Sequence, residues 1–489
     1  MAKEQTALFA KSPLPQVYTS FWGKQVYTTM LNAKKLFSYD ASLATFQTKN
    51  GTMTLPKVFL PFFLEMLLLN MMGTINTLML SHYSDDAVAA VGAASQLVGM
   101  VLTLYTVIGT GASIVINHNL GAGKKEAASD AAFCSIVFCG FLSLILGTIL
   151  SLFASPVLGL MHLEARVHQY AVTYFRIAMQ FSFFQALISS MSGIFRSFGH
   201  PKIAVCVSLI SSGLMAFLDY LVIFQPLPFP LAGVFGIACS YVISEGCGMV
   251  LIAYLLYKIP IGLDLSGKSF HTLKRIGKIL QVGVPGGISS ISYNLSQVIS
   301  TSIIAILGTA AISTKIYVSN IVYYVYVLGM SLGLSTSLFI GWLCGAGKYE
   351  QAYRLNLQNL KITIFINLLL SCLIRLFALP LLGLFTDDPA ILNMGRTLMT
   401  IDILVEIGRG FNHIEENSLR GSGDVVYPMV VSIFSCWSMS ILFSYLLGIR
   451  LGLGLPGCWI AFAMDEFFRG TAYLIRWKSR KWMSKTRLS

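Results

Sequence analysis

Charged side chains are scarce in this sequence. Only 11% of its 489 residues are charged, 55% are hydrophobic, and the mean hydropathy is +0.72. A soluble domain carries about 25% charged residues. This scarcity excludes a soluble multidomain enzyme and predicts a chain that lies largely within a bilayer.

Several motifs of catalysis and metal binding are also missing. No C-x-x-C pair occurs among the nine cysteines, which lie in or at the ends of apolar runs and are expected to be small buried hydrophobes. No P-loop is present, which argues against ATP-driven pumping by this chain. Gly452 to Gly457 match G-x-G-x-x-G, but they lie between two apolar runs and not in a βαβ unit. The sequence therefore predicts neither an enzyme nor a bound cofactor.

Long apolar runs, in contrast, are abundant. Roughly 20 apolar residues cross a bilayer core as a helix. Twelve runs of about this length are bounded by Gly, Pro or charged residues: 58–80, 88–116, 131–161, 170–194, 203–225, 234–257, 279–307, 317–344, 358–385, 397–418, 426–449 and 456–475. The pattern predicts an all-α polytopic membrane protein with twelve transmembrane helices.

The basic residues indicate the orientation of these helices. Most of the 34 Lys and Arg lie in the N-terminal segment, in alternate loops and in the C-terminal tail, whereas the opposite loops hold only Arg166, Lys315, Arg396 and Arg450. Basic loops stay on the cytoplasmic side. We therefore expect both termini in the cytoplasm and a plasma (inner) membrane location. The net charge of +13 is then a topology signal that requires no nucleic-acid partner.

The chain repeats itself. Gly121-Ala-Gly-Lys124 recurs 224 residues later as Gly345-Ala-Gly-Lys348, and the same offset relates Pro61 to Pro285, Asn70 to Asn294 and Arg196 to Arg420. Near the end of each half the offset becomes 221 and relates Gly236 to Gly457 and Glu245 to Glu466. Two homologous halves of six helices each share one orientation, which is the parallel-repeat arrangement of some secondary transporters.

The repeat and the charge pattern together set the expected boundaries. They predict a cytoplasmic N-terminal extension at 1–55, an N-lobe with helices 1–6 at 56–257, a cytoplasmic linker at 258–278, a C-lobe with helices 7–12 at 279–476 and a basic cytoplasmic tail at 477–489. The two six-helix lobes are expected to be pseudosymmetric.

Ionisable residues gather on the predicted tenth helix. Their spacing of three and four residues places them on one stripe, formed by Asp402, Glu406, Arg409, His413, Glu416 and Arg420. A charge at the centre of a membrane helix costs about 3 kcal/mol. The stripe must therefore face protein or water. It is either a structural ladder of salt bridges or a surface that couples a cation to a substrate.

Isolated polar residues occur in the other predicted spans. Glu65 lies in the first helix, where the repeat has Ser289, so this carboxylate is needed in one lobe only; Asn76 and Asp219 also belong to the N-lobe. Five further residues are interpreted as packing or secondary positions: Asn70, Asn294, Glu245, Asp465 and Glu466, with Arg469 as the i+4 partner of Asp465.

The sequence resembles the multidrug and toxic compound extrusion (MATE) family from residue 56 to residue 483. The similarity rests on Gly73-Thr-Ile-Asn-Thr-Leu-Met-Leu80, Ala87-Val-Ala-Ala-Val-Gly92, the Gly121 turn, Leu419-Arg-Gly-Ser-Gly-Asp424 and Ala463-Met-Asp-Glu-Phe-Phe-Arg-Gly470 followed by Arg476-Trp477. The resemblance implies two six-helix lobes around a central cavity. It also implies export of amphipathic, often cationic small organic compounds in exchange for Na⁺ or H⁺, without a cofactor, by a chain that functions as a monomer.

This chain departs from the family pattern at two positions. Many members have Asp where this chain has Asn76, and Glu where it has Ser289. The role of binding the coupling ion therefore falls first on Glu406 with Arg409, then on Glu416, Asp402 and His413, with Asp219 and Glu65 as candidates in the other lobe. Na⁺ is expected at Glu406, Asp219 or Glu65.

Three other interpretations remain open at this point. A lipid-linked oligosaccharide flippase of the same superfold would favour a cationic cavity, a membrane enzyme would need a nucleophile or metal cluster, and a receptor would not need carboxylates in its spans. For an exporter, we expect the substrate to meet an apolar and aromatic surface that includes the tyrosines of the seventh and eighth helices: Tyr293, Tyr317, Tyr323, Tyr324 and Tyr326.

Overall fold

A computed structural model describes residues 40, 42–48, 51–159, 161, 163–225, 233–259 and 272–486. The chain divides into two units, Met1–Ser42 and Leu43–Ser489, and the second unit contains all the helices discussed below. Most of the predicted N-terminal extension, the middle of the predicted linker and residues 487–489 lie outside the described residues.

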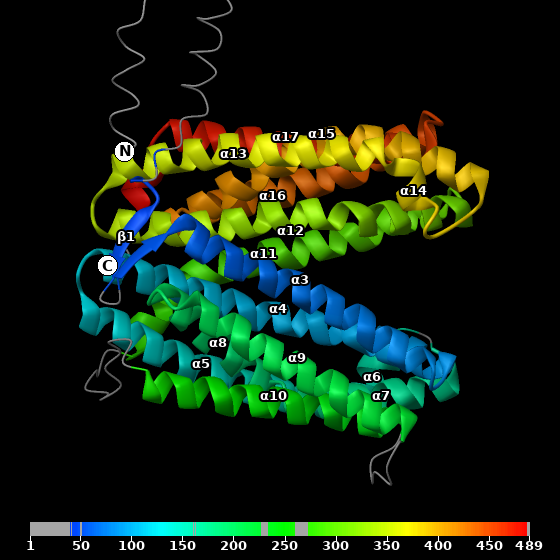
Figure 1. The fold of residues 1–489 in the computed structure, drawn as a ribbon, viewed down its shortest axis with the longest axis horizontal. Coiled ribbons are helices and arrows are strands. Elements are labelled where there is room, and N and C mark those ends of the chain that lie inside the picture. Colours follow the sequence, from blue (N-terminus) through cyan, green and yellow to red (C-terminus); the bar gives the residue numbers. More distant parts are fainter. Residues whose placement is uncertain are drawn as a thin grey trace, which may run out of the picture. The chain divides into compact units, whose positions relative to one another are not determined.

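The helices form two successive groups. The N-lobe contains α3 (Leu55–Ser81), α4 (Asp85–Gly121), α5 (Lys125–Leu152), α6 (Ala154–Gly159), α7 (Ala165–Gln180), α8 (Phe183–Ser197), α9 (Pro201–Phe224) and α10 (Gly233–Lys258). The C-lobe contains α11 (Thr272–Ala305), α12 (Thr309–Gly345), α13 (Tyr349–Leu376), α14 (Ala378–Leu382), α15 (Pro389–Ser422), α16 (Val426–Ser435), the π-helical η2 (Cys436–Leu442) and η3 (Ser444–Arg450), α17 (Gly454–Lys478) and the 3₁₀ helix η4 (Lys481–Lys485). Figure 1 shows the two groups as neighbouring layers of long helices.

Local sequence signals account for several helix ends. Proline begins α9 and α15, where its fixed φ suits the first helical turn, and Asp388 caps α15 by accepting a hydrogen bond from the Ala390 N–H at 2.8 Å. The repeat-equivalent Gly123 and Gly347 have φ angles of 74° and 72°, which a residue with a Cβ rarely adopts. They reverse the chain between α4 and α5 and between α12 and α13.

Each of the twelve predicted apolar runs overlaps one or more of these helices. Within the described residues, eight helices are long and apolar enough to cross a membrane, and α7 with α8 makes a ninth span, bent by 48°. The remaining three spans are α11, α15 and α17. The last two carry most of the buried charged residues of the C-lobe, which lowers their hydropathy.

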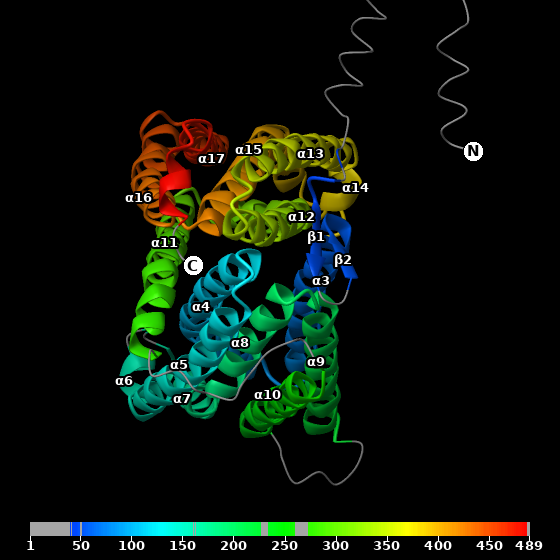
Figure 2. The ribbon, with the colours of Figure 1, turned by 90° about the vertical axis from the view of Figure 1, so that its left-hand side faces the viewer.

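The first helix of each lobe packs against the other lobe. Helix α11 packs along α4 of the N-lobe, and α3 packs along α12 of the C-lobe. Seen end-on, α3 and α11 lie on opposite sides of the junction between the lobes (Figure 2). Since α3 and α11 begin the two halves of the chain, this packing follows the predicted two-fold repeat.

The lobes touch most closely at the ends of α4 and α12. A Cβ atom built on Gly121 would lie 2.1 Å from the Trp342 carbonyl oxygen, and one built on Gly345 would lie 2.1 Å from the His118 carbonyl oxygen. His118 and Trp342 are themselves 224 residues apart. The pseudo-two-fold axis therefore passes between these two glycine contacts, at the end of the lobes that bears the basic Lys124 and Lys348 loops.

Both ends of the described chain pack near this contact. An antiparallel hairpin of β1 (Thr45–Thr48) and β2 (Gly51–Thr54) places Phe46 against Trp342, with ring centroids 4.4 Å apart. On α4, the His118 ring bonds to the Gly421 carbonyl oxygen at 2.8 Å and to the Thr486 carbonyl oxygen at 3.3 Å. These contacts close the basic end of the junction.

The structure corrects some expected features. The linker was predicted to extend to residue 278, but α11 already begins at Thr272. The basic residues there suggested a loop, yet Arg275 lies in α11 and forms an ion pair with Asp130 of α5. The predicted tail starts inside α17. All nine cysteines are free, as expected, but Cys206, Cys247 and Cys372 are exposed on their helices and not buried.

The glycine contact predicts a strong effect of a single methyl group. Gly121→Ala would force the lobes apart at the basic end and should destabilise the protein by about 1–3 kcal/mol, as overpacking does. Gly99→Ala in the same helix is the matched control, because a Cβ there meets nothing within 4 Å. The midpoints of thermal unfolding of the two variants test this, and equal midpoints would contradict the close contact.

Candidate functional site

A cavity of about 460 Å³ lies between the two lobes. Most of its wall comes from α3, α4, α8, α9 and α10, and the C-lobe contributes residues of α11, α12 and α15. Four charged residues line it: Glu65, Arg196, Glu245 and Arg420.

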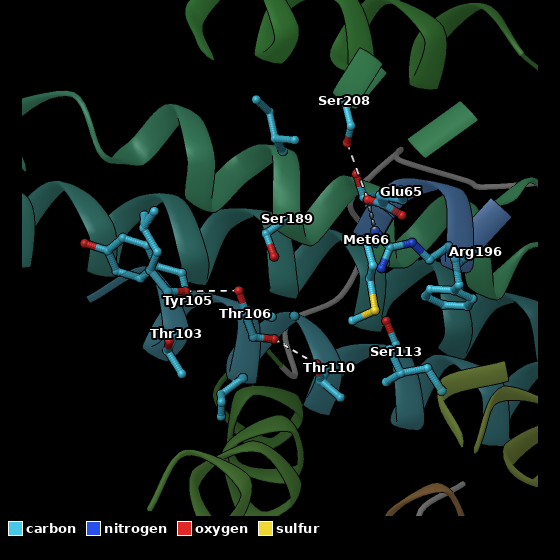
Figure 3. Close-up of a pocket in the computed structure, with 18 of the residues that line it drawn as sticks. Glu65, Met66, Thr103, Tyr105, Thr106, Thr110, Ser113, Ser189, Arg196 and Ser208 are labelled. Carbon is cyan, nitrogen blue, oxygen red and sulfur yellow. Dashed lines mark hydrogen bonds and ion pairs between the residues drawn. The ribbon is translucent and has the colours of Figure 1, made fainter. Parts of the chain in front are cut away.

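An ion pair crosses the wall of this cavity (Figure 3). The Arg196 Nη2 atom lies 2.9 Å from Glu65 Oε1, and Ser208 donates to the same oxygen at 3.4 Å. The pair joins α8 to α3, while the Arg196 guanidinium also stacks over the Phe62 ring at 4.9 Å. The predicted ion-binding residue Glu65 is therefore neutralised by an arginine.

The equivalent arginine of the C-lobe is paired differently. Arg420 forms its ion pair with Glu416, one turn earlier in α15. The position equivalent to Glu65 is Ser289, so α11 offers no carboxylate here. Arg420 thus lines the cavity, and its pair with Glu416 is separate from the rest of the predicted polar stripe.

Aliphatic side chains and hydroxyl groups make up most of the rest of the wall. Thr103, Thr106 and Thr110 follow one face of α4, and Ser189 lies on α8 (Figure 3). Ser192 of α8 also belongs to the wall. None of the five tyrosines expected to recognise a substrate lines this cavity. Their expected place at the substrate surface is therefore wrong for this cavity, whose aromatic residues are Phe62 and Tyr105.

The remaining residues of the stripe meet α17 inside the C-lobe. We define the C-lobe charge cluster as Asp402, Glu406, Arg409 and His413 of α15 together with Asp465, Glu466 and Arg469 of α17. Glu406 is fully buried and forms an ion pair with Arg409 through Oε1, while its Oε2 has no hydrogen-bond partner in the described part of the chain. The cluster joins two helices that pack along each other.

Glu466 lies at the centre of this cluster. Its Oε1 lies 3.0 Å from Arg469 Nη2 and 3.6 Å from Arg409 Nε, and its Oε2 accepts a hydrogen bond from Asn412 at 2.7 Å. The sequence suggested only a packing or secondary position for it. Both arginines therefore share a carboxylate that the repeat makes equivalent to Glu245 of the N-lobe.

The remaining carboxylates of the cluster are Asp465 and Asp402. Asp465 has an arginine and a serine as partners, and Asp402 has a tryptophan. Asp465 pairs with Arg469 at 2.7 Å and accepts a hydrogen bond from Ser435 at 2.6 Å. Asp402 accepts from the Trp459 indole N–H at 3.0 Å. The ion pair predicted between Asp465 and Arg469 is present, but it belongs to the larger cluster.

Aromatic rings cover the arginines of the cluster. Tyr326 lies over Arg409, with the guanidinium carbon 5.7 Å from the ring centroid, and Tyr293 lies over Arg469 at 5.7 Å. Tyr326 also meets the His413 ring edge-on at 5.0 Å. Two of the predicted tyrosines therefore shield buried charges. Tyr317 and Tyr323 instead stack on Phe385 and Tyr326.

The formal charges of the cluster do not balance. Four carboxylates (Asp402, Glu406, Asp465 and Glu466) face two guanidinium groups (Arg409 and Arg469), which leaves two negative charges in excess when His413 is neutral. Buried charges are stable only when they are paired or neutralised. Two of the four carboxylates therefore have no guanidinium group of the cluster to balance their charge.

The N-lobe carries a smaller polar group. Asp219 of α9 is buried, and its Oδ1 has no hydrogen-bond partner within the described residues. Glu245 of α10 lies at the cavity wall. Asn76 donates to the Met215 sulfur at 3.5 Å, one turn before Asp219. The structure thus places Asn76 and Asp219 on neighbouring helices, apart from the Glu65–Arg196 pair.

Two predicted packing residues lie at exposed positions. Asn70 lies on α3 beside Tyr323, and Asn294 lies on α11. Neither belongs to the C-lobe charge cluster. No group of three or more His, Cys, Asp or Glu suited to a metal ion occurs in the part of the chain that the structure describes.

The sequence suggested only a packing or secondary role for Asp465, Glu466 and Arg469 of α17. Glu466 was related to Glu245 by the repeat, but nothing local showed that it contacts α15. Asn367 of α13, which donates to the Glu406 carbonyl oxygen at 3.0 Å, gave no signal because a single Asn in an apolar run is commonplace. Only the packing of α13 on α15 reveals it.

Comparison with known proteins agrees with this architecture. The MatE family model matches residues 61–221 and again 285–446, so the two matches begin 224 residues apart. An uncharacterized transporter, YisQ, of Bacillus subtilis is 35% identical over 446 residues, which are 91% of this chain and 98% of that protein. The probable multidrug resistance protein NorM of Thermotoga maritima is 25% identical over 88% of this chain and 93% of its own length.

Solved structures share the fold. A MATE structure in complex with MaL6 superposes with a TM-score of 0.80 at 21% identity and covers 89% of this chain and 97% of its own. A transporter of the MOP superfamily from Pyrococcus furiosus, whose binding pocket is described as having reverse polarity, gives a TM-score of 0.78 at 21% identity over 88% of this chain and 96% of its own. The repeated family match and the full-length relatives establish that this chain belongs to the MatE family of multidrug efflux transporters.

Proposed function

We propose that this protein is a secondary active antiporter that exports amphipathic, often cationic organic compounds in exchange for Na⁺ or H⁺. The observation that carries the proposal is the charge imbalance of the C-lobe charge cluster, where four carboxylates face two arginines within the membrane-spanning part of the lobe. An uncompensated carboxylate in this environment costs several kcal/mol. Cation uptake would remove that cost, so the cluster favours a bound Na⁺ or proton.

Helix α15 connects this cluster to the cavity. Asp402, Glu406, Arg409 and His413 lie in its middle, and Asn417 and Arg420, one to two turns further on, line the cavity. A cation that changes the packing of α15 against α17 would therefore also change the cavity wall. This connection supports mutually exclusive binding of ion and substrate, which antiport requires.

The junction between the lobes supports alternating access. It is closed at the end bearing the basic loops by the Gly121–Trp342 and Gly345–His118 backbone contacts. We assign this end to the cytoplasm on the basis of those loops, together with both chain termini. The plasma membrane is the proposed location, and a monomer is the proposed functional unit because the cavity and the cluster are both formed within one chain.

The flippase alternative has no structural observation in its favour. A lipid-linked oligosaccharide would require cationic side chains free to bind its pyrophosphate. Both arginines of the cavity are already paired, Arg196 with Glu65 and Arg420 with Glu416. The names of the relatives, which describe probable multidrug resistance proteins, favour small organic substrates instead.

Glu406→Gln should abolish coupled transport while leaving expression and membrane insertion near normal. The amide has nearly the same shape as the carboxylate, but it carries no negative charge for a cation to neutralise. We expect at least a tenfold lower rate for a fluorescent organic cation in proteoliposomes, with Na⁺ and H⁺ gradients imposed separately. The gradient that drives the wild type identifies the coupling ion. Glu350→Gln, at an exposed carboxylate of α13, is the control. A wild-type rate in Glu406→Gln would exclude this residue from coupling.

Glu65→Gln should weaken binding of organic cations to the cavity, because Arg196 would then keep its positive charge unpaired. A unit charge about 7 Å away costs about 2 kcal/mol at an effective dielectric of about 20. We therefore expect more than a tenfold higher KM for a cationic dye and a smaller change for a neutral substrate. Ser208→Ala keeps the ion pair and is the control. Equal KM changes for both substrates would contradict an electrostatic role.

A further inference from the structure

Glu415 of α15 has no role in the mechanism above, although it is fully buried. In the sequence, Glu415 lies between His413 and the Glu416–Arg420 pair. Its side chain does not join that pair and lies beside Asn356 of α13. Asn356 is the polar side chain beside its carboxylate, and within the described residues neither carboxylate oxygen makes a well-formed hydrogen bond. Lys478, at the end of α17, is the charged residue that acts on it electrostatically.

Helix α13 presents a row of polar side chains to this region. Asn356, Asn359, Thr363 and Asn367 follow one another at three and four residues and are fully buried. They begin near the Lys348 loop and reach the C-lobe charge cluster, a rise of about 16 Å along the helix. The row therefore runs between Glu415 and Glu406.

Each of the three amides in this row uses its nitrogen atom as a hydrogen-bond donor. Asn367 donates its amide N–H to the Glu406 carbonyl oxygen at 3.0 Å, and Asn359 donates to Thr336 Oγ1 at 2.9 Å. The Thr336 hydroxyl is itself used as a donor to the Leu332 carbonyl oxygen, so it can only accept from Asn359. Asn356 donates to Ser418 Oγ at 2.8 Å. Each amide nitrogen is therefore bonded.

The oxygen atoms of the same amides are left without partners. Within the described residues no well-formed hydrogen bond reaches Oδ1 of Asn356, Asn359 or Asn367, or either oxygen of Glu415, which has Asn356 beside it. Every unpartnered atom of this group is an acceptor, and buried acceptors need a proton or a cation. Oxygen-only ligand sets suit hard cations and not anions. The row is thus built for positive charge.

The N-lobe lacks this arrangement. The repeat places Ala132, Ser135, Cys139 and Ser143 of α5 where α13 has its polar row, and Met191 where α15 has Glu415. The Ser135 hydroxyl is hydrogen-bonded to the Ser190 hydroxyl, with 2.8 Å between the two Oγ atoms. The polar row is therefore not required by the shared fold and is specific to the lobe that contains the charge cluster.

We propose that Glu415, with the amide oxygens of Asn356 and Asn359, forms a second monovalent-cation site, which lies between the C-lobe charge cluster and the basic end of the lobe. The inference rests on the proposed function, because the ion it holds is the ion that the cluster couples to transport. The polar row of α13 then supplies the passage of that ion between the cluster and the cytoplasm.

Counting bound cations on the purified full-length protein tests the site. Bound Na⁺ is counted with ²²Na⁺ at saturation, and bound protons are counted by potentiometric titration. Glu415→Gln should hold one cation fewer per chain than the wild type, as Na⁺ or as a proton, and the two counts distinguish these ions. Glu350→Gln, an exposed carboxylate at the start of α13, should leave both counts unchanged. Equal counts of both ions in the wild type and Glu415→Gln overturn the proposal.

Asn359→Leu provides the second variant, because it removes an acceptor oxygen and keeps the carboxylate. It should weaken the affinity of the second site at least tenfold without changing the affinity of the cluster, and an unchanged affinity would exclude the amide row as ligand. Transport by Glu406→Gln separates the two proposals. Normal transport in that variant would refute the coupling role of the cluster, whereas the cation count of Glu415→Gln decides the second site independently.

Discussion

The need to neutralise buried negative charge governs the C-lobe. Glu466 binds both Arg409 and Arg469, yet Asp402, Glu406 and Asp465 bring the carboxylates to twice the number of guanidinium groups. In a low-dielectric interior such a group is stable only with added positive charge. Tyr326 and Tyr293 cover the two arginines, Asn412 binds the Glu466 carboxylate, and Asn367 binds the backbone carbonyl oxygen of Glu406, so these contacts hold the cluster in place between α15 and α17.

The two lobes share a fold but differ in chemistry. Where α15 carries Asp402, Glu406, Arg409 and His413, the repeat places Ala178, Ser182, Gln185 and Ser189 in and around α7 and α8. The corresponding N-lobe region breaks into two helices bent by 48°, whereas α15 is continuous. One lobe therefore has an unbroken charged helix, and the other contributes most of the cavity wall. The proposed division of ion binding and substrate binding between the lobes rests on this difference.

The sequence predicted the twelve spans and the repeat, because apolar length and the Gly345-Ala-Gly turn are local signals. It also identified Glu406 and Arg409 from their helical spacing. It did not predict that Arg196 neutralises Glu65, because these two residues lie on different helices and are 131 positions apart in the chain. The grouping of Glu466 with α15, and the orientation of the α13 amides, likewise depend on packing that no spacing rule contains.

The ion pair at the cavity wall has a consequence for the design of inhibitors. The Arg196 and Glu65 side chains keep 23% and 12% of their surface exposed. A blocking compound made mainly of hydrocarbon would remove the remaining water from this pair, and the desolvation of paired charges costs free energy. Blockers that place a hydrogen-bonding group beside the pair should therefore bind more tightly than hydrocarbon compounds of the same size.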